Sequence, residues 1–183
     1  MIDGKKMLEL ITGRQSDRKY RDAPVEAEKI DRILEAGRVS PSACNAQPWK
    51  FIVVNEPVLK NKIAKAAAAK LIGMNAFVNQ APLLIILIRE KPNFSSKVGA
   101  TIKNKDYSRI DVGIAAGNIC MQAEAEGLGS CMVGWFDEPL LKKLLSIPRS
   151  KRVELIITVG YSQSEQREKR RKPKDEVVSY NKY

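Results

Sequence analysis

The sequence contains no histidine among its 183 residues. Histidine is a common zinc ligand and the usual general base near neutral pH. Its absence therefore excludes the usual zinc sites and the Ser-His-Asp and Cys-His catalytic arrangements. No metal site is predicted. If the protein is an enzyme, a group other than an imidazole must supply its chemistry.

Cysteines and long apolar runs are also scarce. Cys44, Cys120 and Cys131 form no C-x-x-C pair, which indicates reduced thiols rather than disulfides. The longest apolar run, residues 81–88, is too short to span a membrane, and the first residues lack the apolar core of a signal peptide. We therefore expect a cytoplasmic protein that has no membrane partner.

Acidic residues are outnumbered, since 32 Lys and Arg face 21 Asp and Glu, which gives a formal charge of +11. Much of this excess is local, because residues 167–174 hold six cations and one acid. Aromatic residues make up only 6% of the chain and form no aromatic-basic repeat that would stack bases. We therefore expect no nucleic-acid partner. The excess of positive charge then indicates either an anionic ligand or a solvated surface.

The hydrophobic pattern predicts one α+β domain over residues 1–183, in which helices cover a single sheet. Asp3 should cap a first helix that turns Met7, Leu8 and Ile11 inward, and Pro24 should open the second helix. The expected helices are residues 3–13, 24–37, 56–71, 111–129 and 137–148; the expected strands are 50–54 and 81–88, both buried, 130–136 and 152–161; residues 91–107 should form a loop.

Neither a G-x-G-x-x-G nor a Walker A loop is present, so another segment would have to hold a phosphate ligand. The segment RQSDRKY is a candidate for this role. In an extended chain, Arg14, Ser16 and Arg18 line one side, and the residues between them face the other. Planar guanidinium groups match phosphate oxygens, and a serine hydroxyl adds a small neutral donor. Taken alone, such a segment is more often a solvated basic linker between two helices.

Five motifs in order, RQSDRKY, SPSACNAQPWKF, AEGLGSCMVGWF, VGY and KRRKPKDEVV, resemble the nitroreductase family of flavin mononucleotide (FMN) enzymes. They cover nearly the whole chain. The resemblance implies an α+β fold with a central mixed, mainly antiparallel sheet flanked by helices. It also implies a homodimer with FMN at the subunit interface. Electrons would pass by a ping-pong mechanism from NADH or NADPH to nitro compounds, quinones or similar small acceptors.

The same resemblance gives the opening segment its roles. Arg14 matches the position that reaches the flavin phosphate, and Ser16 the hydroxyl near the phosphate and the ribityl chain. Arg18 matches the cation beside N1 and O2 of the ring. Reduction places negative charge on that edge, so a fixed cation there stabilises the reduced flavin.

The basic C-terminal segment also has matches in the family. Lys169 and Arg171 correspond to paired basic positions at the phosphate, and Arg170 should point away from it. A solvated basic tail is the alternative interpretation, especially for Lys169. Residues 162–183 are expected to form an arm that packs on the partner subunit.

Two further segments complete the implied site. Pro41, Ser42 and Asn45 match the segment that the partner subunit lays against the flavin. Gly134 and Trp135 match the turn whose backbone N–H donates to flavin N5, the atom that accepts and delivers hydride. A backbone donor needs no particular side chain, and glycine lets the chain approach the ring closely.

Several alternatives remain open on the sequence. A dehalogenase that uses flavin on the same fold is one, and a non-catalytic basic protein that binds flavin or nucleic acid is another. The sequence leaves open the physiological acceptor, the choice between NADH and NADPH, and whether residues 91–107 form a lid. It also leaves open whether Trp135 narrows the pocket or packs in the core, and whether Cys44 lies near the ligand.

Overall fold

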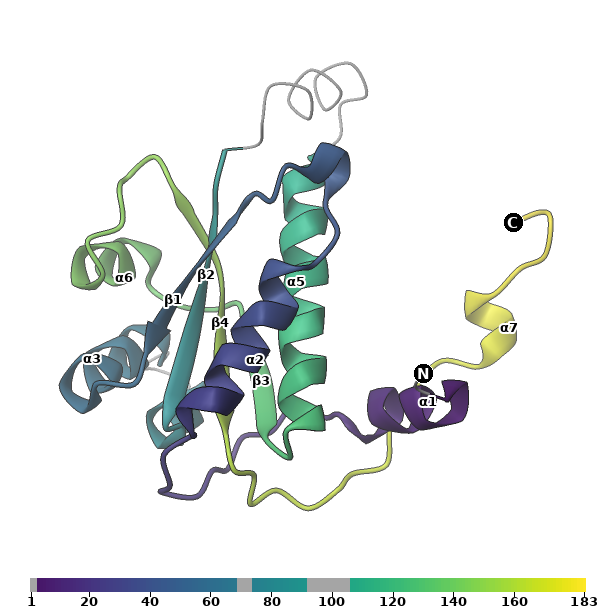
Figure 1. The fold of residues 1–183 in the computed structure, drawn as a ribbon, viewed down its shortest axis with the longest axis horizontal. Helices are drawn as coiled ribbons and strands as arrows, with labels where there is room; N and C mark the ends of the chain where they lie inside the picture. The colour runs from purple at the N-terminus through teal and green to yellow at the C-terminus, as the bar shows by residue number, and fades with distance from the viewer. Residues whose placement is uncertain (1–2, 69–73, 92–105) are drawn as a thin grey trace.

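A computed structural model describes residues 3–68, 74–91 and 106–183 (Figure 1). Its centre is a four-stranded sheet in the order β1-β2-β4-β3, and each neighbouring pair is antiparallel. The α+β prediction with a mainly antiparallel sheet is therefore confirmed. The strands are β1 Trp49–Val54, β2 Leu83–Arg89, β3 Gly129–Val133 and β4 Arg152–Gly160.

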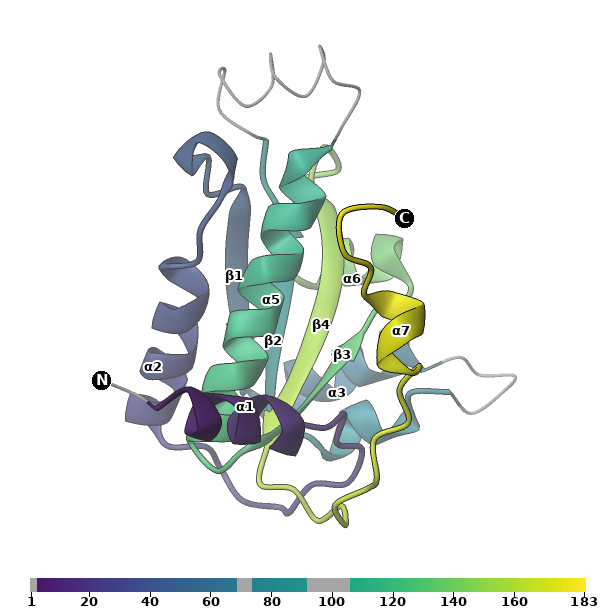
Figure 2. The ribbon, with the colours of Figure 1, turned by 90° about the vertical axis from the view of Figure 1, so that its right-hand side faces the viewer.

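Helices cover both faces of the sheet (Figures 1 and 2). Helices α2 and α5 pack on one face over an apolar cluster that includes Ile33 and Ile119, and α3 and α6 cover the opposite face around Ile63 and Leu141. Helix α1 lies across one end of α5, and α7 projects from the body on the C-terminal segment. The helices are α1 Gly4–Gly13, α2 Ala27–Arg38, α3 Pro57–Ala67, α5 Tyr107–Ala125, α6 Glu138–Leu144 and α7 Lys174–Val177.

Two of the expected helix caps are present. The Asp3 carboxylate accepts a hydrogen bond from the Lys5 N–H at 3.1 Å, and the Asp137 carboxylate accepts one from the Leu140 N–H at 2.9 Å. Each cap satisfies a backbone donor that a helix leaves without a partner in its first turn. Asp137 matters most here, because it ends the turn that carries Gly134 and Trp135.

The second helix begins later than the sequence predicts. It starts at Ala27 with Glu26 in the cap position, so Pro24 lies outside the helix and does not open it. The neighbouring Val25 packs against the same apolar cluster as α2, which keeps this stretch extended along the end of the sheet. Tertiary packing has overridden the usual preference of proline for the first helical turn.

Burial differs from the prediction at two elements. Met7, Leu8 and Ile11 of α1 are not turned inward; their exposed fractions lie between 42% and 61%. In β1 only Val54 is buried, because β1 is an edge strand, whereas β2 lies between two strands and is buried from Leu83 to Ile88.

Helix α5 begins four residues earlier than expected, at Tyr107. Helix α3 ends at Ala67, and the expected continuation through residues 69–71 lies outside the described residues. So does most of the predicted loop at 91–107.

Gly160, the last residue of β4, provides a test of the packing at this end of the sheet. A Cβ atom there would lie 2.4 Å from Cδ and 2.7 Å from Cγ of Pro82, whose ring cannot rotate away. We expect Gly160→Ala to lower the free energy of unfolding by about 1–3 kcal/mol in urea titrations, the usual cost of overpacking. Gly4→Ala is the control, because no atom lies within 4 Å of its added Cβ; equal unfolding midpoints for the two variants would contradict this packing.

Candidate functional site

A strongly basic cavity of about 340 Å³ lies between the segment after α1 and the C-terminal segment. Six cationic residues and one acidic residue are among its lining, so an anion is the ligand that its charge favours. The charged lining residues are Arg14, Arg18, Arg167, Glu168, Lys169, Arg170 and Arg171.

Lys169 shows the effect of this crowding. Partial burial lowers the pKa of its ammonium group, and the charges of Arg14 and Arg171 lower it further. Its ammonium also donates to the backbone carbonyl of Ile11 at 2.9 Å, in the last turn of α1. Lys169 is therefore not part of a wholly solvated tail, which was the alternative interpretation of this residue. Arg170 is also among the residues that line this cavity, and its backbone carbonyl accepts from Arg171 Nη1 at 2.8 Å.

The Gln15 side chain holds the two segments together. Its Oε1 accepts from the backbone N–H of Arg167 at 3.1 Å and from Arg167 Nε at 3.3 Å. Its Nε2 donates to Asp17 Oδ1 at 3.1 Å and to the carbonyl of Glu165 at 3.0 Å. Arg167 Nη2 also donates to the Ser16 carbonyl at 2.6 Å. Residues more than 150 positions apart in the chain are thus joined directly.

Asp17 fixes the same segment to the sheet. It is 2% exposed, and its N–H donates to the carbonyl of Ser130 in β3 at 3.0 Å. Its Oδ1 accepts from the Ser162 hydroxyl at 2.7 Å. Gly129 leaves room for this carboxylate, since a Cβ there would lie 2.6 Å from Asp17 Oδ2. Because Asp17 points inward, its neighbour Arg18 points outward and is exposed, as the alternation of an extended chain requires.

Arg18 lies over an aromatic ring. Its guanidinium carbon is 5.8 Å from the centre of the Phe77 ring, within the range of a cation–π contact. Phe77 belongs to the short helix η2, Ala76–Gln80. This contact limits the directions that the guanidinium can take without neutralising its charge.

The turn after β3 is hydrogen-bonded to the residue before η2 and to α3. Asn75, the residue before η2, donates through its side-chain amide to the carbonyl of Trp135 at 3.1 Å. The Asp137 N–H donates to the carbonyl of Ala66 at 2.8 Å. These bonds fasten the turn to the last turn of α3 and to the residue before η2.

Gly134 and Trp135 are open to solvent in this turn. The nearest atom to a Cβ built on Gly134 is a Leu155 methyl carbon at 3.9 Å, and Trp135 is 64% exposed. Trp135 is therefore not a core residue of the chain, which removes that alternative. Gly134 is four positions along the chain from Ser130 beside the basic cavity, a span of about 13 Å in a strand. The cavity and the turn thus lie along one edge of the sheet.

The segment with Pro41, Ser42 and Asn45 is not part of this arrangement. It is held at the start of α5, where the Ala43 N–H donates to Asp111 Oδ1 at 3.1 Å. The basic cavity lies near the other end of α5, since Gly13 is packed beside Glu124. Asp111 and Glu124 are thirteen positions apart, or about 20 Å along a helix, so one chain does not bring the two groups together.

The loop at 42–47 nevertheless has a defined shape. Cys44, Asn45 and Gln47 all adopt positive φ angles, of 52°, 50° and 45°, which residues with side chains rarely do. The Ser42 hydroxyl accepts from the Gln47 N–H at 2.9 Å, and the Gln47 amide donates to Asn45 Oδ1 at 3.0 Å. Such conformations persist only where the surroundings hold them, and they are frequent at ligand sites.

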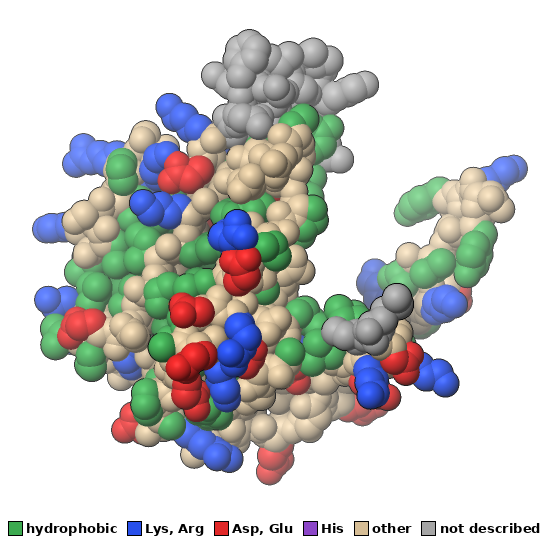
Figure 3. Space-filling model, viewed as in Figure 1, with side chains coloured by type: hydrophobic (Ala, Val, Ile, Leu, Met, Phe, Trp, Pro, Cys, Tyr) green, Lys and Arg blue, Asp and Glu red, His purple; other side chains and the backbone are tan. Residues whose placement is uncertain are grey.

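An apolar surface lies between these two groups of residues. Ile110 and Ile114 of α5 are 45% and 37% exposed, and added Cβ atoms at Gly113 and Gly117 would meet nothing within 4 Å. In Figure 2 this helix stands in front of the sheet with α1 across its lower end. The exposed apolar residues of α1 extend the surface, and green side chains are visible on that helix in Figure 3.

The sequence did not identify the residues that hold the site together. Gln15, Asp17 and Arg167 carry most of the connecting hydrogen bonds, and Asn75 and Phe77 flank the turn and Arg18. Arg167 could have been included from its place in the basic run. The others are common residue types whose spacing carries no signal, because their partners are distant in the chain.

Comparisons with known proteins agree with this geometry. The model of the nitroreductase family matches residues 11–161. A putative NADH dehydrogenase/NAD(P)H nitroreductase from Methanothermobacter thermautotrophicus is 34% identical over 170 residues, which cover 87% of this chain and 81% of the relative.

One solved structure and one further relative add detail. The structure of an FMN-dependent nitroreductase from Clostridium difficile R20291 has a TM-score of 0.76 and 30% identity, with coverage of 96% of this chain and 99% of the other. An iodotyrosine deiodinase from Thermotoga neapolitana is 26% identical over 198 residues, which cover 97% of this chain and 98% of the relative. On the family match and the relatives named here, this chain belongs to the nitroreductase family of oxidoreductases.

Proposed function

We propose that this protein binds FMN and passes electrons from NAD(P)H to nitro compounds, quinones or similar acceptors by a ping-pong mechanism. The observation that carries the proposal is the basic cavity, in which both ends of the chain place cations around a space suited to a phosphate group. The similarity to an FMN-dependent nitroreductase supports the choice of flavin. The cytoplasm, where NAD(P)H is supplied, is the proposed location.

The chain's own residues divide the work of holding the cofactor. Arg14, Lys169 and Arg171 bind the phosphate, and the Ser16 hydroxyl donates beside it. Arg18, oriented by Phe77, supplies a fixed positive charge at the N1 and O2 edge.

The turn after β3 completes the set of contacts from one chain. Gly134 and Trp135 offer backbone N–H groups to N5, from a turn that Asn75 and Asp137 hold in place. FMN, when bound, supplies the ring that accepts hydride from NAD(P)H and returns electrons to the acceptor. The chain thus needs no protein nucleophile and no histidine.

A second copy of the chain supplies the remaining contacts in this proposal. One chain holds Pro41, Ser42 and Asn45 about 20 Å along α5 from the basic cavity. Two copies that pair through the exposed apolar faces of α5 and α1 can bring this loop of one subunit to the cavity of the other. In Figure 1 the segment after Ser162 runs past α1 and projects from the body, which supports residues 162–183 as an arm on the partner.

Reductive dehalogenation is a second candidate, because the Thermotoga neapolitana deiodinase spans nearly the whole chain. Both reactions use the same flavin contacts, so the choice between them depends on the acceptor. Acceptor screening with a nitroarene, a quinone and an iodotyrosine separates the two. The non-catalytic alternative is not retained, because the chain belongs to a family of oxidoreductases.

The two ends of the basic cavity should act on one phosphate. Arg14→Ala and Arg171→Ala should each weaken FMN binding by one to two decades, since a charge-assisted hydrogen bond contributes about 1.5–3 kcal/mol. Fluorescence titration of the apoprotein measures this. Lys19→Ala is the matched control, because it removes a cation from the same segment outside the cavity. Unchanged affinity in both arginine variants would place the flavin elsewhere.

Pairing of two chains should be visible in solution. We expect sedimentation at micromolar concentration to give a dimer, and Ile114→Glu to shift it toward a monomer that retains little FMN. The reason is that a charge would be buried in the apolar contact. Val58→Glu places the same charge on an exposed apolar position of α3 and should change neither property. A stable wild-type monomer loaded with flavin would refute the shared site.

Arg18 should affect the reaction more than cofactor binding. Its charge meets negative density that develops only on reduction, so Arg18→Ala should slow reduction by NAD(P)H by about tenfold or more and lower the flavin potential. Anaerobic stopped-flow and potentiometry measure the two effects. The wild-type enzyme should give parallel double-reciprocal lines, because reductant and acceptor use the site in turn; intersecting lines would exclude the ping-pong mechanism.

A further inference from the structure

A buried carboxylate joins the loop at 42–47 to helix α5. Asp111 of this helix is 3% exposed, and its Oδ1 accepts the Ala43 N–H at 3.1 Å. The side-chain bonds of Ser42 and Gln47, in contrast, lie within the loop. In Figure 1 the segment that follows α2 reaches the upper end of α5, where this contact lies. Asp111 thus attaches the backbone of the loop to the helix.

A second polar side chain of α5 supports the start of the same segment. Asn118 lies seven residues, or nearly two turns, after Asp111, so both side chains lie on the same side of the helix. Asn118 Nδ2 donates to Ser40 Oγ at 2.8 Å, and the Ser40 hydroxyl donates to the carbonyl of Ala36 in α2 at 3.0 Å. The chain between α2 and the loop is therefore held along α5 at two points.

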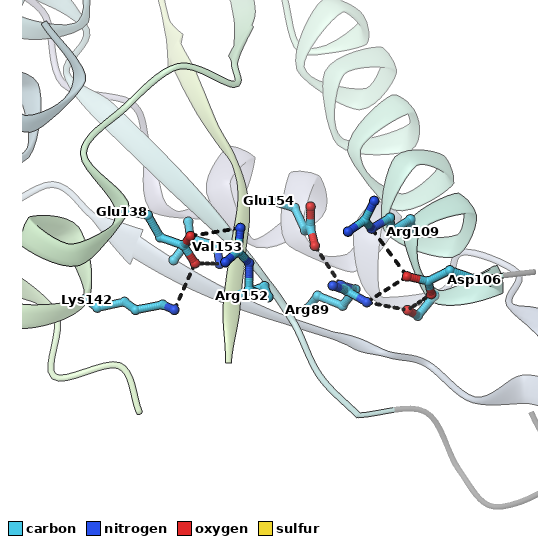
Figure 4. Close-up of polar contacts among 9 residues, drawn as sticks. Arg89, Asp106, Arg109, Glu138, Lys142, Arg152, Val153 and Glu154 are labelled. Atoms are coloured by element: carbon cyan, nitrogen blue, oxygen red, sulfur yellow. Dashed lines mark hydrogen bonds and ion pairs between the residues drawn. The ribbon is translucent and has the colours of Figure 1, made fainter. Parts of the chain in front are cut away.

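The helix that carries Asp111 is itself anchored to the sheet (Figure 4). Arg89 of β2 meets Glu154 of β4 at 2.6 Å and Asp106 at 2.9 Å. Because Asp106 immediately precedes α5, these ion pairs fix the start of the helix relative to the two central strands. A bond from Asp111 therefore gives the loop a defined place in the fold.

The second carboxylate oxygen of Asp111 has no partner that would offset its burial. Oδ2 is buried without a hydrogen bond, and Asp111 forms no ion pair within the described ranges of the chain. Asp106 differs, because Arg89 and Arg109 both face it (Figure 4). A buried polar oxygen without a partner destabilises a fold. Stability of the helix therefore does not account for Asp111, whereas its bond to the loop gives it a role.

We propose that Asp111 is a positioning residue for the shared FMN site. Its bond to the Ala43 N–H holds the loop in its observed shape. In that shape, Pro41, Ser42 and Asn45 meet the flavin held by the partner subunit. Three positive φ angles in the loop are a conformation that persists only where the surroundings hold it. This inference rests on the proposed function. Because Asp111 is buried in its own chain, its effect reaches FMN through the loop.

Fluorescence titration of the apoprotein with FMN tests this role. D111L removes the acceptor and should weaken binding about fivefold to tenfold, because a hydrogen bond that orders the loop is lost. D111N keeps an oxygen for the Ala43 N–H and should bind within about twofold of the wild type. D31L makes the same change at an exposed acid of α2 and should have no effect.

The donor side of the same bond provides a second variant. A43P removes the N–H, and proline suits the first position of the short helix η1, Ala43–Asn45, because Ser42 before it is already extended at φ −145° and ψ 154°. A43P should weaken FMN binding as D111L does. The double variant A43P/D111L should be no weaker than either single variant, because both changes break one bond. Additive losses would overturn the inference.

Hydrogen exchange measures the loop without any cofactor. In the apoprotein, the N–H groups of Asn45, Ala46 and Gln47, which are hydrogen-bonded within the loop, should exchange about tenfold faster in D111L than in the wild type or D111N. Unchanged exchange or unchanged FMN affinity in D111L would overturn the inference, as would a D111N affinity as low as that of D111L. A wild-type protein that binds no FMN would instead refute the proposed function, and the exchange rates would still show whether Asp111 holds the loop.

Discussion

The buried carboxylate of Asp17 is the contact on which the rest of the site depends. Its backbone N–H bonds the segment after α1 to β3. Its side chain accepts hydrogen bonds from Gln15 and Ser162, which belong to the two segments of chain on either side of the basic cavity. A buried carboxylate is costly unless its oxygens are hydrogen-bonded, and here the donors come from both ends of the chain. The hydrogen bonds that the Asp17 carboxylate accepts therefore also position the two segments that carry the cations of the cavity.

The two faces and the two ends of helix α5 have different neighbours. Its inner face closes the apolar cluster on one face of the sheet, and its outer face, with Ile110, Gly113 and Ile114, stays uncovered in a single chain. Its two ends hold the two halves of the proposed cofactor site apart. Apolar or small residues on two sides of α5 thus fit two different neighbours, the sheet on one side and, in the proposed dimer, a second chain on the other.

Elements with a strong local signal could be predicted from the sequence. The apolar runs of β2 and β4 and the caps Asp3 and Asp137 were correct, because burial between strands and capping depend on neighbouring residues. The prediction that the apolar residues of α1 turn inward was wrong, because the sequence shows an apolar face but does not say what covers it.

The connecting residues of the site were beyond the reach of the sequence. Gln15 meets Arg167 across more than 150 residues, and Pro24 was displaced from its helix by packing of Val25. Such contacts are set by tertiary structure, and an ordinary glutamine gives no sign of them. The motifs that resemble the family located Arg14, Ser16 and Arg18 in the cavity, yet only the structure revealed that the loop at 42–47 lies at the far end of α5.

The direct joining of Gln15 to Arg167 has a consequence for damage to the protein. All four strands end by Gly160, so proteolytic cleavage between residues 162 and 166 would leave the sheet and both apolar clusters intact. It would nevertheless release Arg167, Lys169, Arg170 and Arg171, four of the six cations that line the cavity. Exposed segments outside regular structure are where proteases act first. A single cut there would therefore leave the sheet in place and remove most of the cations of the anion site.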